Sequence, residues 1–291
     1  MRGKERLVRR FRIVMEYDGC SFHGWQRQPV LLTVQGELEK ALSLIAASHV
    51  DVHGSGRTDA GVHALAQVAH FDMDTRMNGV LLKKALNCLL PPGIVIHNCM
   101  EVGPAFHARF GARAKTYRYR ILNRALRSAL GRTHVWHVWQ PLNRSAMDRA
   151  AALLTGTHDF KSFEGAGSPR SSTVRTLFHA AFDDEPANPG VFAFEVTANG
   201  FLRYMVRNLV GTLVQVGMGK IREESIPEIL AGKSRHLAGI TAPPQGLYLK
   251  AVHYDFSDDF REPAMGVRQP PGVDMGGKGR CRAWSCGRDQ H

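Results

Sequence analysis

The chain has 291 residues, of which 44% are hydrophobic, and this is enough to bury a sizeable core in one or two domains. No apolar run approaches the roughly 20 residues that span a bilayer. The basic N-terminus leads into a strand pattern and not into a signal-peptide core, so we expect no membrane association and a cytoplasmic location. The net charge of +12 favours a polyanionic partner, although much of the excess lies near the two ends of the chain.

Strands and helices alternate in the first part of the chain. Apolar residues at helical spacing predict a helix over about residues 34–45, with Thr33 as its N-cap. A second helical pattern over about residues 81–89 stops at Pro91-Pro92, because proline interrupts helices. Alternating or apolar runs predict strands at residues 10–17, 50–53, 63–73 and 94–102.

The turn before the strand at residues 63–73 carries the first candidate functional residue. Residues 54–71 read GSGRTDAGVHALAQVAHF and place the carboxylate of Asp59 beside Arg57 in a Gly-rich turn. A short acidic side chain in a tight turn between core segments is held rigidly, which suits a nucleophile. On these residues alone, a surface ion pair contributing about 0–1 kcal/mol is the more frequent explanation.

The second part of the chain repeats the alternation. Residues 115–122 predict a strand with Tyr117 and Tyr119 on a packed face, and with Arg118 and Arg120 on a face that can meet phosphate. The remaining elements are expected as a helix near 145–154, strands at 173–183 and 191–199, a long helix over about 201–216, and a strand at 248–256.

This pattern predicts an α+β protein with two similar halves, each an antiparallel sheet covered by helices on one face, and an active-site cleft between the halves. We expect an N-terminal half over residues 1–104, a connection over 105–114, and a C-terminal half over 115–257. Residues 258–291 are rich in Gly, Pro and Arg without periodicity, which predicts a disordered basic tail.

A run of basic residues surrounds the strand at residues 115–122. Eight cations follow one another there with no intervening Asp or Glu, namely Arg109, Arg113, Lys115, Arg118, Arg120, Arg124, Arg127 and Arg132. A solvated charged face is the usual explanation for such a run. Because Tyr117 and Tyr119 lie among these cations, we favour a track for nucleic-acid phosphates with aromatic platforms.

Arg207 is a second candidate, because it lies in the apolar helix pattern FLRYMVRNLVGTLVQVG. Val210 and Val214 flank it, which predicts a partly buried guanidinium. A buried cation without a partner is very costly, so a carboxylate or phosphate is required nearby. A structural ion pair or a phosphate contact would each meet that requirement.

The turn at Asp59 resembles the active-site motif of the TruA family of tRNA pseudouridine synthases, in which the equivalent Asp is the nucleophile. Seven further segments between about Phe11 and Phe256 resemble that family in the same order: FHGWQRQP (22–29), TVQGELEKAL (33–42), FHAR (106–109), KTYRY (115–119), TVRT (173–176), MVRN (205–208) and GLYL (246–249). The resemblance implies two α/β halves joined into a continuous mixed sheet. It also implies isomerisation of uridine to pseudouridine at positions 38, 39 and 40 of the tRNA anticodon stem-loop, by a homodimer in which one tRNA spans both subunits.

The resemblance also assigns roles to individual residues. It implies that Arg207 pairs with Asp59, that Tyr117 stacks on the target uracil and takes part in proton removal from carbon 5, and that Leu247 forms an apolar wall for the base. Seven further residues are expected to contact RNA: His23, Trp25, Gln26, Arg27, Arg57, Lys161 and Arg175. Trp25 could instead anchor the core. Ser55 stands where the family motif leads us to expect Ala, and we expect this change to be silent.

Several alternatives remain open at this point. Asp59 could attack ribose carbon 1′ or the base, or could remove a ribose proton. The isomerisation is redox-neutral and needs no cofactor, and the chain has no dinucleotide fingerprint or P-loop. The five cysteines lack paired metal-ligand spacing, so we expect reduced thiols and no metal site, including at Cys281 and Cys286.

Two rival functions come from other classes. A noncatalytic RNA-binding protein would share the basic run and the aromatic strand but would not need Asp59, Arg207 and Tyr117 together. A metal-dependent phosphohydrolase could use Asp59, His63 and His70, although no second acidic cluster accompanies them.

Overall fold

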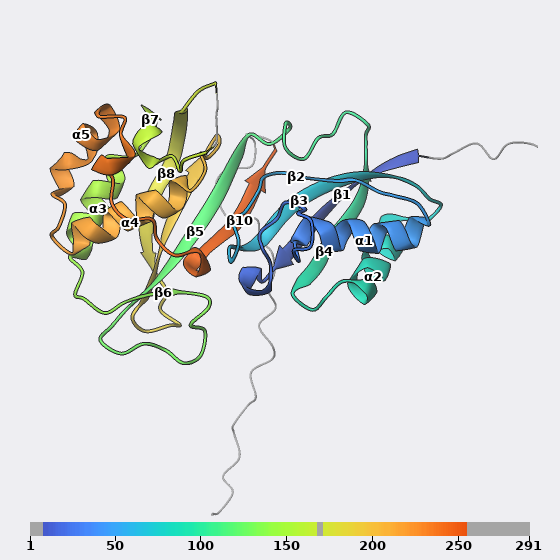
Figure 1. The fold of residues 1–291 in the computed structure, drawn as a ribbon, viewed down its shortest axis with the longest axis horizontal. Helices are drawn as coiled ribbons and strands as arrows, with labels where there is room; N and C mark the ends of the chain where they lie inside the picture. Colours follow the sequence, from blue (N-terminus) through green and yellow to red (C-terminus); the bar gives the residue numbers. More distant parts are fainter. Residues whose placement is uncertain (1–7, 168–170, 255–291) are drawn as a thin grey trace, which may run out of the picture. The chain divides into compact units, whose positions relative to one another are not determined.

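One mixed sheet organises the part of the chain that the computed structural model describes, residues 8–167 and 171–254 (Figure 1). Eight of its ten strands follow one path: β4 (Ile94–Val102), β1 (Val8–Tyr17), β3 (His63–Asp74), β10 (Leu247–His253), β5 (Ala114–Asn123), β9 (Val191–Ala198), β8 (Val174–Asp184) and β7 (Gly156–Asp159). The two short strands β2 (Val52–Gly54) and β6 (Trp136–Val138) pair with β3 and β5. The predicted continuous mixed sheet is confirmed.

Strand β10 joins the early strands to the late ones. It runs parallel to β3, with Tyr248 opposite His63, and antiparallel to β5, with Leu247 opposite Tyr119. The last described strand of the chain therefore holds the two parts of the sheet together, and it brings the start of β3 close to β5.

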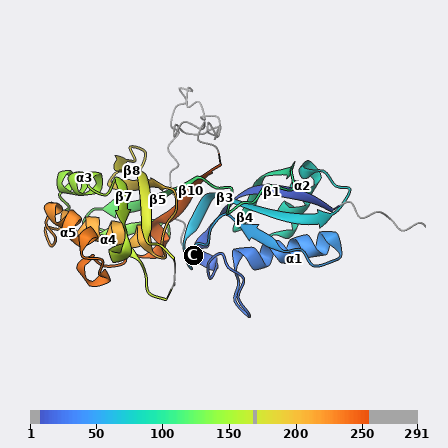
Figure 2. The same cartoon turned by 90° about the horizontal axis from the view of Figure 1, so that it is seen from above.

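The helices gather in two groups, with α1 and α2 at one end of the sheet and α3, α4 and α5 at the other (Figure 2). Their bounds are α1 (Val34–Ala46), α2 (Gly79–Leu89), α3 (Arg144–Ala152), α4 (Met205–Gly217) and α5 (Ile226–Ala231). Five single-turn 3₁₀ helices complete the set: η1 (Gly19–Ser21), η2 (Lys161–Phe163), η3 (Glu223–Ser225), η4 (Arg235–Leu237) and η5 (Pro244–Gly246). No helix in the described ranges is long and apolar enough to cross a membrane.

Helix α1 forms as its sequence predicts. The hydroxyl of Thr33 accepts a hydrogen bond from the amide of Gly36, which satisfies one of the free N–H groups of the first turn. Leu38 and Leu42 lie one turn apart and are fully buried in the core that β1 also lines with Phe11 and Ile13. Burying each leucine contributes about 1.5–3 kcal/mol.

Helix α4 begins later than predicted. The pattern from Phe201 indicated a helix, but the first helical residue is Met205. Tyr204 precedes it in the left-handed region at φ 59°, a conformation that breaks a helix and is strained for an aromatic residue. Gly211 then lets the helix approach Ile240, because a Cβ at that glycine would lie 1.7 Å from the Ile240 carbonyl oxygen.

Two strands and one α-helix were not predicted, namely β6, β7 and α5, and each is only three to six residues long. The five 3₁₀ helices were not predicted either. The expected tail at residues 258–291, its cysteines and the first residues of the basic N-terminus lie outside the described residues. The division at residues 104, 114 and 257 stays a prediction.

Candidate active site

The Asp59 turn lies between β2 and β3 and is held by backbone hydrogen bonds. The Asp59 carbonyl accepts from the amide of Val62 at 3.1 Å, and the Thr58 carbonyl accepts from the amide of Trp25 at 3.0 Å. The Thr58 side chain also bonds the buried hydroxyl of Tyr17 at 2.8 Å. The backbone on both sides of Asp59 is therefore fixed to the core, which restricts where its carboxylate can point.

Gly24 allows the first loop of the chain to close on this turn. Its φ is +90°, and a Cβ at this position would lie 2.6 Å from the Thr58 carbonyl oxygen. Glycine is needed there for both reasons, conformation and space. The FHGW segment therefore supports the Asp59 turn from behind.

Ser55 is buried and hydrogen-bonded, and the expectation that it is a silent exchange for Ala stays a prediction. Its hydroxyl donates to Gln67 Oε1 at 2.7 Å, and Gln67 Nε2 donates to the Gly56 carbonyl at 3.0 Å. The hydroxyl thus orients the amide that holds the start of the turn. An alanine would fit the same space but would not make this bond.

The predicted ion pair between Asp59 and Arg207 is present. Arg207 Nη1 lies 3.2 Å from Asp59 Oδ2, and the two side chains are 14% and 33% exposed. Arg207 is itself fixed, because its Nε donates to the Ala242 carbonyl at 2.7 Å while its own carbonyl accepts from the Ala242 amide at 3.0 Å. The guanidinium is aimed at Asp59 before any substrate binds.

The environment of Asp59 does not simply favour its charged form. Burial raises the pKa of the Asp59 carboxyl above its ordinary value, and the charge and hydrogen bond of Arg207, together with the charge of Arg203, oppose that rise. Arg207 acts in the expected direction, but burial has the larger effect. No hydrogen-bond partner among the described residues reaches Asp59 Oδ1, so one oxygen remains available.

Tyr204 and Arg203 belong to this site and were not predicted. The Tyr204 ring contacts two guanidinium groups, with the Cζ atoms of Arg203 and Arg207 at 4.8 and 5.0 Å from its centroid. Arg203 also donates to the Tyr204 hydroxyl at 3.2 Å. In the sequence, the only sign of this cluster was that two arginines lie close to a tyrosine. The left-handed backbone at Tyr204 brings the three side chains together.

Tyr117 lies in β5 near the pair. It is 8% exposed, and its ring packs edge-on against Phe201 with centroids 5.0 Å apart. Burial, together with the nearby Tyr17 and Asp59, raises the pKa of the Tyr117 hydroxyl well above its ordinary value. The influence of Asp59 on this pKa places the phenol and the carboxylate within electrostatic reach of one another.

Leu247 is the first residue of β10 and is 5% exposed. It lies opposite Tyr119, whose hydroxyl donates to the Pro243 carbonyl at 2.7 Å. This segment runs directly after Ala242, the residue that fixes Arg207. The apolar wall for a base that the resemblance implies stays a prediction.

Lys115 is a further residue whose position was not foreseen. Its amine lies against the turn, 3.2 Å from where a Cβ on Gly56 would be, and it has no partner among the described residues. Burial lowers the pKa of the Lys115 amine to about 8, and the charge of Arg109 adds to the shift. An unpaired cation two residues before Tyr117 is available to an anionic ligand.

The predicted RNA contacts of the first loop and the turn have different environments. Arg57 is exposed and has no partner among the described residues. Arg27 is about half-exposed and pairs with the buried Glu39 at 2.9 Å, so part of its role is structural. Trp25 is 2% exposed and packs on Gly54, which supports the alternative that it anchors the core.

The remaining predicted contacts lie on the surface. His23 is exposed and Gln26 is half-buried, and their side chains have no partner in the described ranges. Lys161 pairs with Glu164 at 2.7 Å, and Arg175 donates to the Ser172 carbonyl at 3.2 Å. The structure does not bring Lys161 and Arg175 into contact with Asp59.

The expectation that β5 carries an uncompensated row of cations is wrong for its central members. Arg120 makes a two-pronged ion pair with Glu185, with Nη2 at 2.7 Å from Oε2, and Arg118 Nε lies 3.8 Å from Glu195. Both acids come from the β8–β9 region, far along the chain. The absence of Asp and Glu near these arginines in the sequence therefore did not mean that they lack acidic partners in the fold. Arg120 is neutralised by Glu185, whereas Arg118 shares Glu195 with Lys250, whose amine lies closer at 3.0 Å.

The histidines of the metal-hydrolase alternative do not join Asp59. His63 stacks on His134 with ring centroids at 4.7 Å, whereas His70 stacks on His53 at 5.0 Å. Asp59 is not among the described metal-binding side chains that converge. The structure therefore offers this rival function no shared metal centre at the turn.

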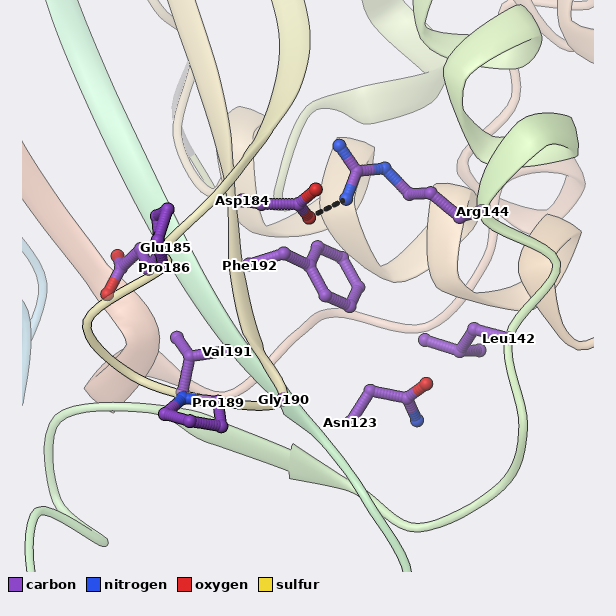
Figure 3. A pocket seen from close by; sticks show the side chains of 10 residues that line it. All are labelled: Asn123, Leu142, Arg144, Asp184, Glu185, Pro186, Pro189, Gly190, Val191 and Phe192. Atoms are coloured by element: carbon purple, nitrogen blue, oxygen red, sulfur yellow. Dashed lines mark hydrogen bonds and ion pairs between the residues drawn. The ribbon is translucent and has the colours of Figure 1, made fainter.

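The hollow drawn in Figure 3 is also separate from the turn. It has a volume of about 400 Å³ and lies at the β8–β9 turn, where Arg144 points toward Asp184 and bonds it at 3.0 Å (Figure 3). None of the predicted site residues lines it.

Comparisons with known proteins agree on one family. A family model described as tRNA pseudouridine synthase matches residues 13–111 and 150–255. A protein named tRNA pseudouridine synthase A from Thermoanaerobacter sp. (strain X514) is 46% identical over 247 residues, which cover 85% of this chain and 100% of that protein. Proteins of the same name from Acetivibrio thermocellus and Geobacillus sp. (strain WCH70) are 44% and 45% identical, over 85% and 86% of this chain and 100% of each relative.

Proposed function

The chain belongs to the tRNA pseudouridine synthase family, and we propose that it isomerises uridine to pseudouridine at positions 38, 39 and 40 of the tRNA anticodon stem-loop. Members of this family are isomerases that act on tRNA. The reaction breaks the N-glycosidic bond, turns the uracil and rejoins it to ribose through carbon 5, with loss of the carbon 5 proton. Atoms and electrons balance within the substrate, so no redox cofactor takes part.

Asp59 is the nucleophile in this proposal, and the single observation that carries it is the contact with Arg207. The guanidinium is fixed by Ala242 and reaches only one carboxylate oxygen, which leaves Oδ1 free to approach a substrate. The positive charge favours the ionised, reactive form of the carboxylate against the effect of burial. Attack at ribose carbon 1′, attack at the base and removal of a ribose proton are all compatible with this geometry.

Tyr117 acts on the base in our proposal. Its pKa is raised, so the phenol is protonated at neutral pH and can stack or donate a hydrogen bond. The phenolic oxygen can take the proton from carbon 5 only if the phenol passes its own proton to water or to the RNA in the same step. Leu247 would close the apolar side of the base.

The surrounding cations suit an RNA backbone. Arg57 and Lys115 lie beside the turn without partners among the described residues, and Arg203 contacts the same Tyr204 ring as Arg207. A base stacked in a stem has to be flipped out before it can react, and Arg57 is placed to fill the vacancy. We further propose that the protein works on tRNA as a homodimer in the cytoplasm, as the family resemblance implies.

The proposal is tested by tritium release from carbon 5 of labelled uridine in unmodified tRNA. The parent should release tritium and Asp59→Asn should not, while Asp51→Asn, an exposed acid outside the turn, should behave like the parent. Transcripts that keep uridine at only one of the three positions assign the target. Release by Asp59→Asn at the parent rate would contradict the role of Asp59.

A noncatalytic RNA-binding protein is the alternative. It predicts salt-sensitive tRNA binding without tritium release by the parent protein. The identity of 46% over 247 residues to a protein named tRNA pseudouridine synthase A speaks against this alternative.

A further inference from the structure

Four side chains with metal-binding atoms converge beside the core of the described chain, and Asp59 is not one of them. Asp18, Cys20, His63 and His134 each offer one donor atom, and these atoms all lie within 4.8 Å of one another. We propose that they bind a single Zn²⁺ ion in a structural site. The donors come from η1 and the residue before it, from the start of β3, and from the segment before β6, so sequence spacing could not predict the site.

The donor set and its dimensions suit zinc. One thiolate, two imidazoles and one carboxylate make a four-coordinate set of nitrogen, sulfur and oxygen ligands, which zinc binds as a tetrahedron. Bonds of about 2.0–2.3 Å separate neighbouring donors by roughly 3.3–3.8 Å. Asp18 Oδ1 lies 3.1 Å from His63 Nδ1 and Asp18 Oδ2 lies 3.3 Å from His134 Nε2. The four donor atoms lie within 4.8 Å of one another, so the widest pair has to close by about 1 Å for all four to reach one ion.

Thr133 supplies an independent observation, because it holds the second ring nitrogen of both histidines. The Thr133 carbonyl lies 3.1 Å from His63 Nε2, and its hydroxyl lies 3.0 Å from His134 Nδ1. Ligating histidines almost always have their other nitrogen bonded to a carbonyl, carboxylate or water, which selects the tautomer. The carbonyl can only accept, so it places the proton of His63 on Nε2 and leaves Nδ1 as the donor atom. The hydroxyl can donate or accept, so it orients the His134 ring and is compatible with Nε2 as the donor atom. These are the same two atoms that lie against Asp18.

Metal binding requires two local changes. His63 Nδ1 now accepts from the Gly19 amide at 3.1 Å, and that bond gives way to the bond with the metal. The His63 and His134 rings are stacked at 24° and must rotate until both lone pairs point to one centre. His63 begins β3, is 2% exposed and also stacks on Tyr248 at 4.7 Å, so most of the movement falls on the three-residue helix η1 and the half-buried His134.

The position of the site gives it a structural consequence. Gly19 packs against Val62, because a Cβ on this glycine would lie 2.2 Å from the Val62 carbonyl oxygen. The Val62 amide in turn bonds the carbonyl of Asp59. Zinc would therefore link the segment before β6 to the rear of the Asp59 turn and would stabilise the folded state in proportion to its occupancy.

Cobalt binding tests the proposal, because Co²⁺ replaces zinc and reports a bound thiolate by a charge-transfer band in the near ultraviolet. The protein is the full-length, tag-free chain with Cys88→Ser, Cys281→Ser and Cys286→Ser, which removes the other exposed or tail thiols. We expect the band to saturate at about one Co²⁺ per chain and to be displaced by Zn²⁺. Zn²⁺ should also raise the melting temperature of this protein.

The variants separate this site from adventitious binding. Adding Cys20→Ser should abolish the band, His134→Ala should weaken Co²⁺ affinity by at least about tenfold, and Thr133→Val should weaken it by about 10- to 100-fold through lost orientation. His49→Ala, an exposed histidine elsewhere, should change nothing. A band that survives Cys20→Ser, or no band at any cobalt concentration that leaves the protein folded, would overturn the proposal.

Discussion

Two arginine–carboxylate pairs, Asp59–Arg207 and Glu185–Arg120, are both partly buried but are bonded in different ways. Arg120 donates from Nε and Nη2 to both oxygens of Glu185, at 2.7–3.2 Å, whereas Arg207 reaches only Oδ2 of Asp59, at 3.2 Å. At Glu185, burial acts to raise the pKa, but the bonds and charge of Arg120 outweigh it and the pKa falls. At Asp59 burial prevails and the pKa rises.

The difference indicates what each pair is for. A carboxylate that is bonded on both oxygens by a planar fork is fully satisfied and can only stabilise the fold. A carboxylate with one free oxygen and an unfavourable environment is held ready to react, at some expense in stability. The predictions that follow exploit this contrast.

The largest expected effect comes from removing the arginine of each pair in turn. Arg207→Gln should lower kcat/KM for tritium release by about 10²–10³-fold, because a preorganised charge at the reacting group is lost. Arg120→Gln should leave kcat/KM near the parent value and lower the free energy of unfolding by about 1–2 kcal/mol, because Glu185 loses its partner. Steady-state kinetics and urea unfolding of both variants measure the two quantities. Equal losses of activity in the two variants would remove the distinction.

The pH dependence of the two pairs should have opposite signs. Glu185 has a lowered folded pKa, so its contribution to stability is present above its unfolded pKa and is lost as pH falls through the folded value. Asp59 has a raised folded pKa, so protonation relieves its burial as pH falls, while tritium release is lost because the ionised form reacts.

Urea unfolding between about pH 4 and 7 measures how the free energy of unfolding of each variant changes with pH. The destabilisation caused by Glu185→Gln should shrink as the pH falls. Asp59→Asn should instead be more stable than the parent near neutral pH, and this gain should shrink on acidification. A loss of stability in Asp59→Asn at neutral pH would show that the pair serves the fold.

Lys115 extends the contrast to a cation with no partner among the described residues. Lys115→Met should raise the melting temperature, since a buried charge is removed, and this gain should shrink as pH rises through about 8, where the amine loses its proton. The same change should weaken tRNA binding. It should also reduce the salt dependence of tRNA affinity by the amount that about one phosphate contact contributes. The exposed Lys84→Met is the matched control, and identical salt slopes in both variants would argue against a phosphate role for Lys115.

The smallest effect is expected at Ser55. Ser55→Ala should lower the free energy of unfolding by about 0.5–1.5 kcal/mol, because one buried hydrogen bond to Gln67 is lost. Gln67 Oε1 still accepts from the Val68 amide, so the turn should keep its shape and its activity. Thermal unfolding of Ser55→Ala, compared with that of the exposed control variant Ser48→Ala, measures this loss of stability. A large fall in activity would mean that the hydroxyl positions Asp59 more directly.

Local patterns alone determined most of the regular structure. The strand predicted at residues 94–102 has the observed bounds, and the helix behind Thr33 has the predicted cap. Side-chain alternation, helical spacing and capping involve neighbours within a few residues, so they can be recognised without the fold. The same applies to the rigid Gly-rich turn around Asp59, whose chemistry was suggested by its family resemblance.

Tertiary structure decided which charges meet. Arg118 and Arg120 appeared uncompensated because Glu195 and Glu185 lie more than 60 positions further along the chain. The start of α4 was misplaced because Tyr204 has a left-handed backbone, which the helical spacing of the apolar residues does not reveal. The convergence of His134 with Asp18, Cys20 and His63 likewise depends on β10 joining β3 to β5. Pairing between distant segments depends on the whole packed sheet, and no local pattern encodes it.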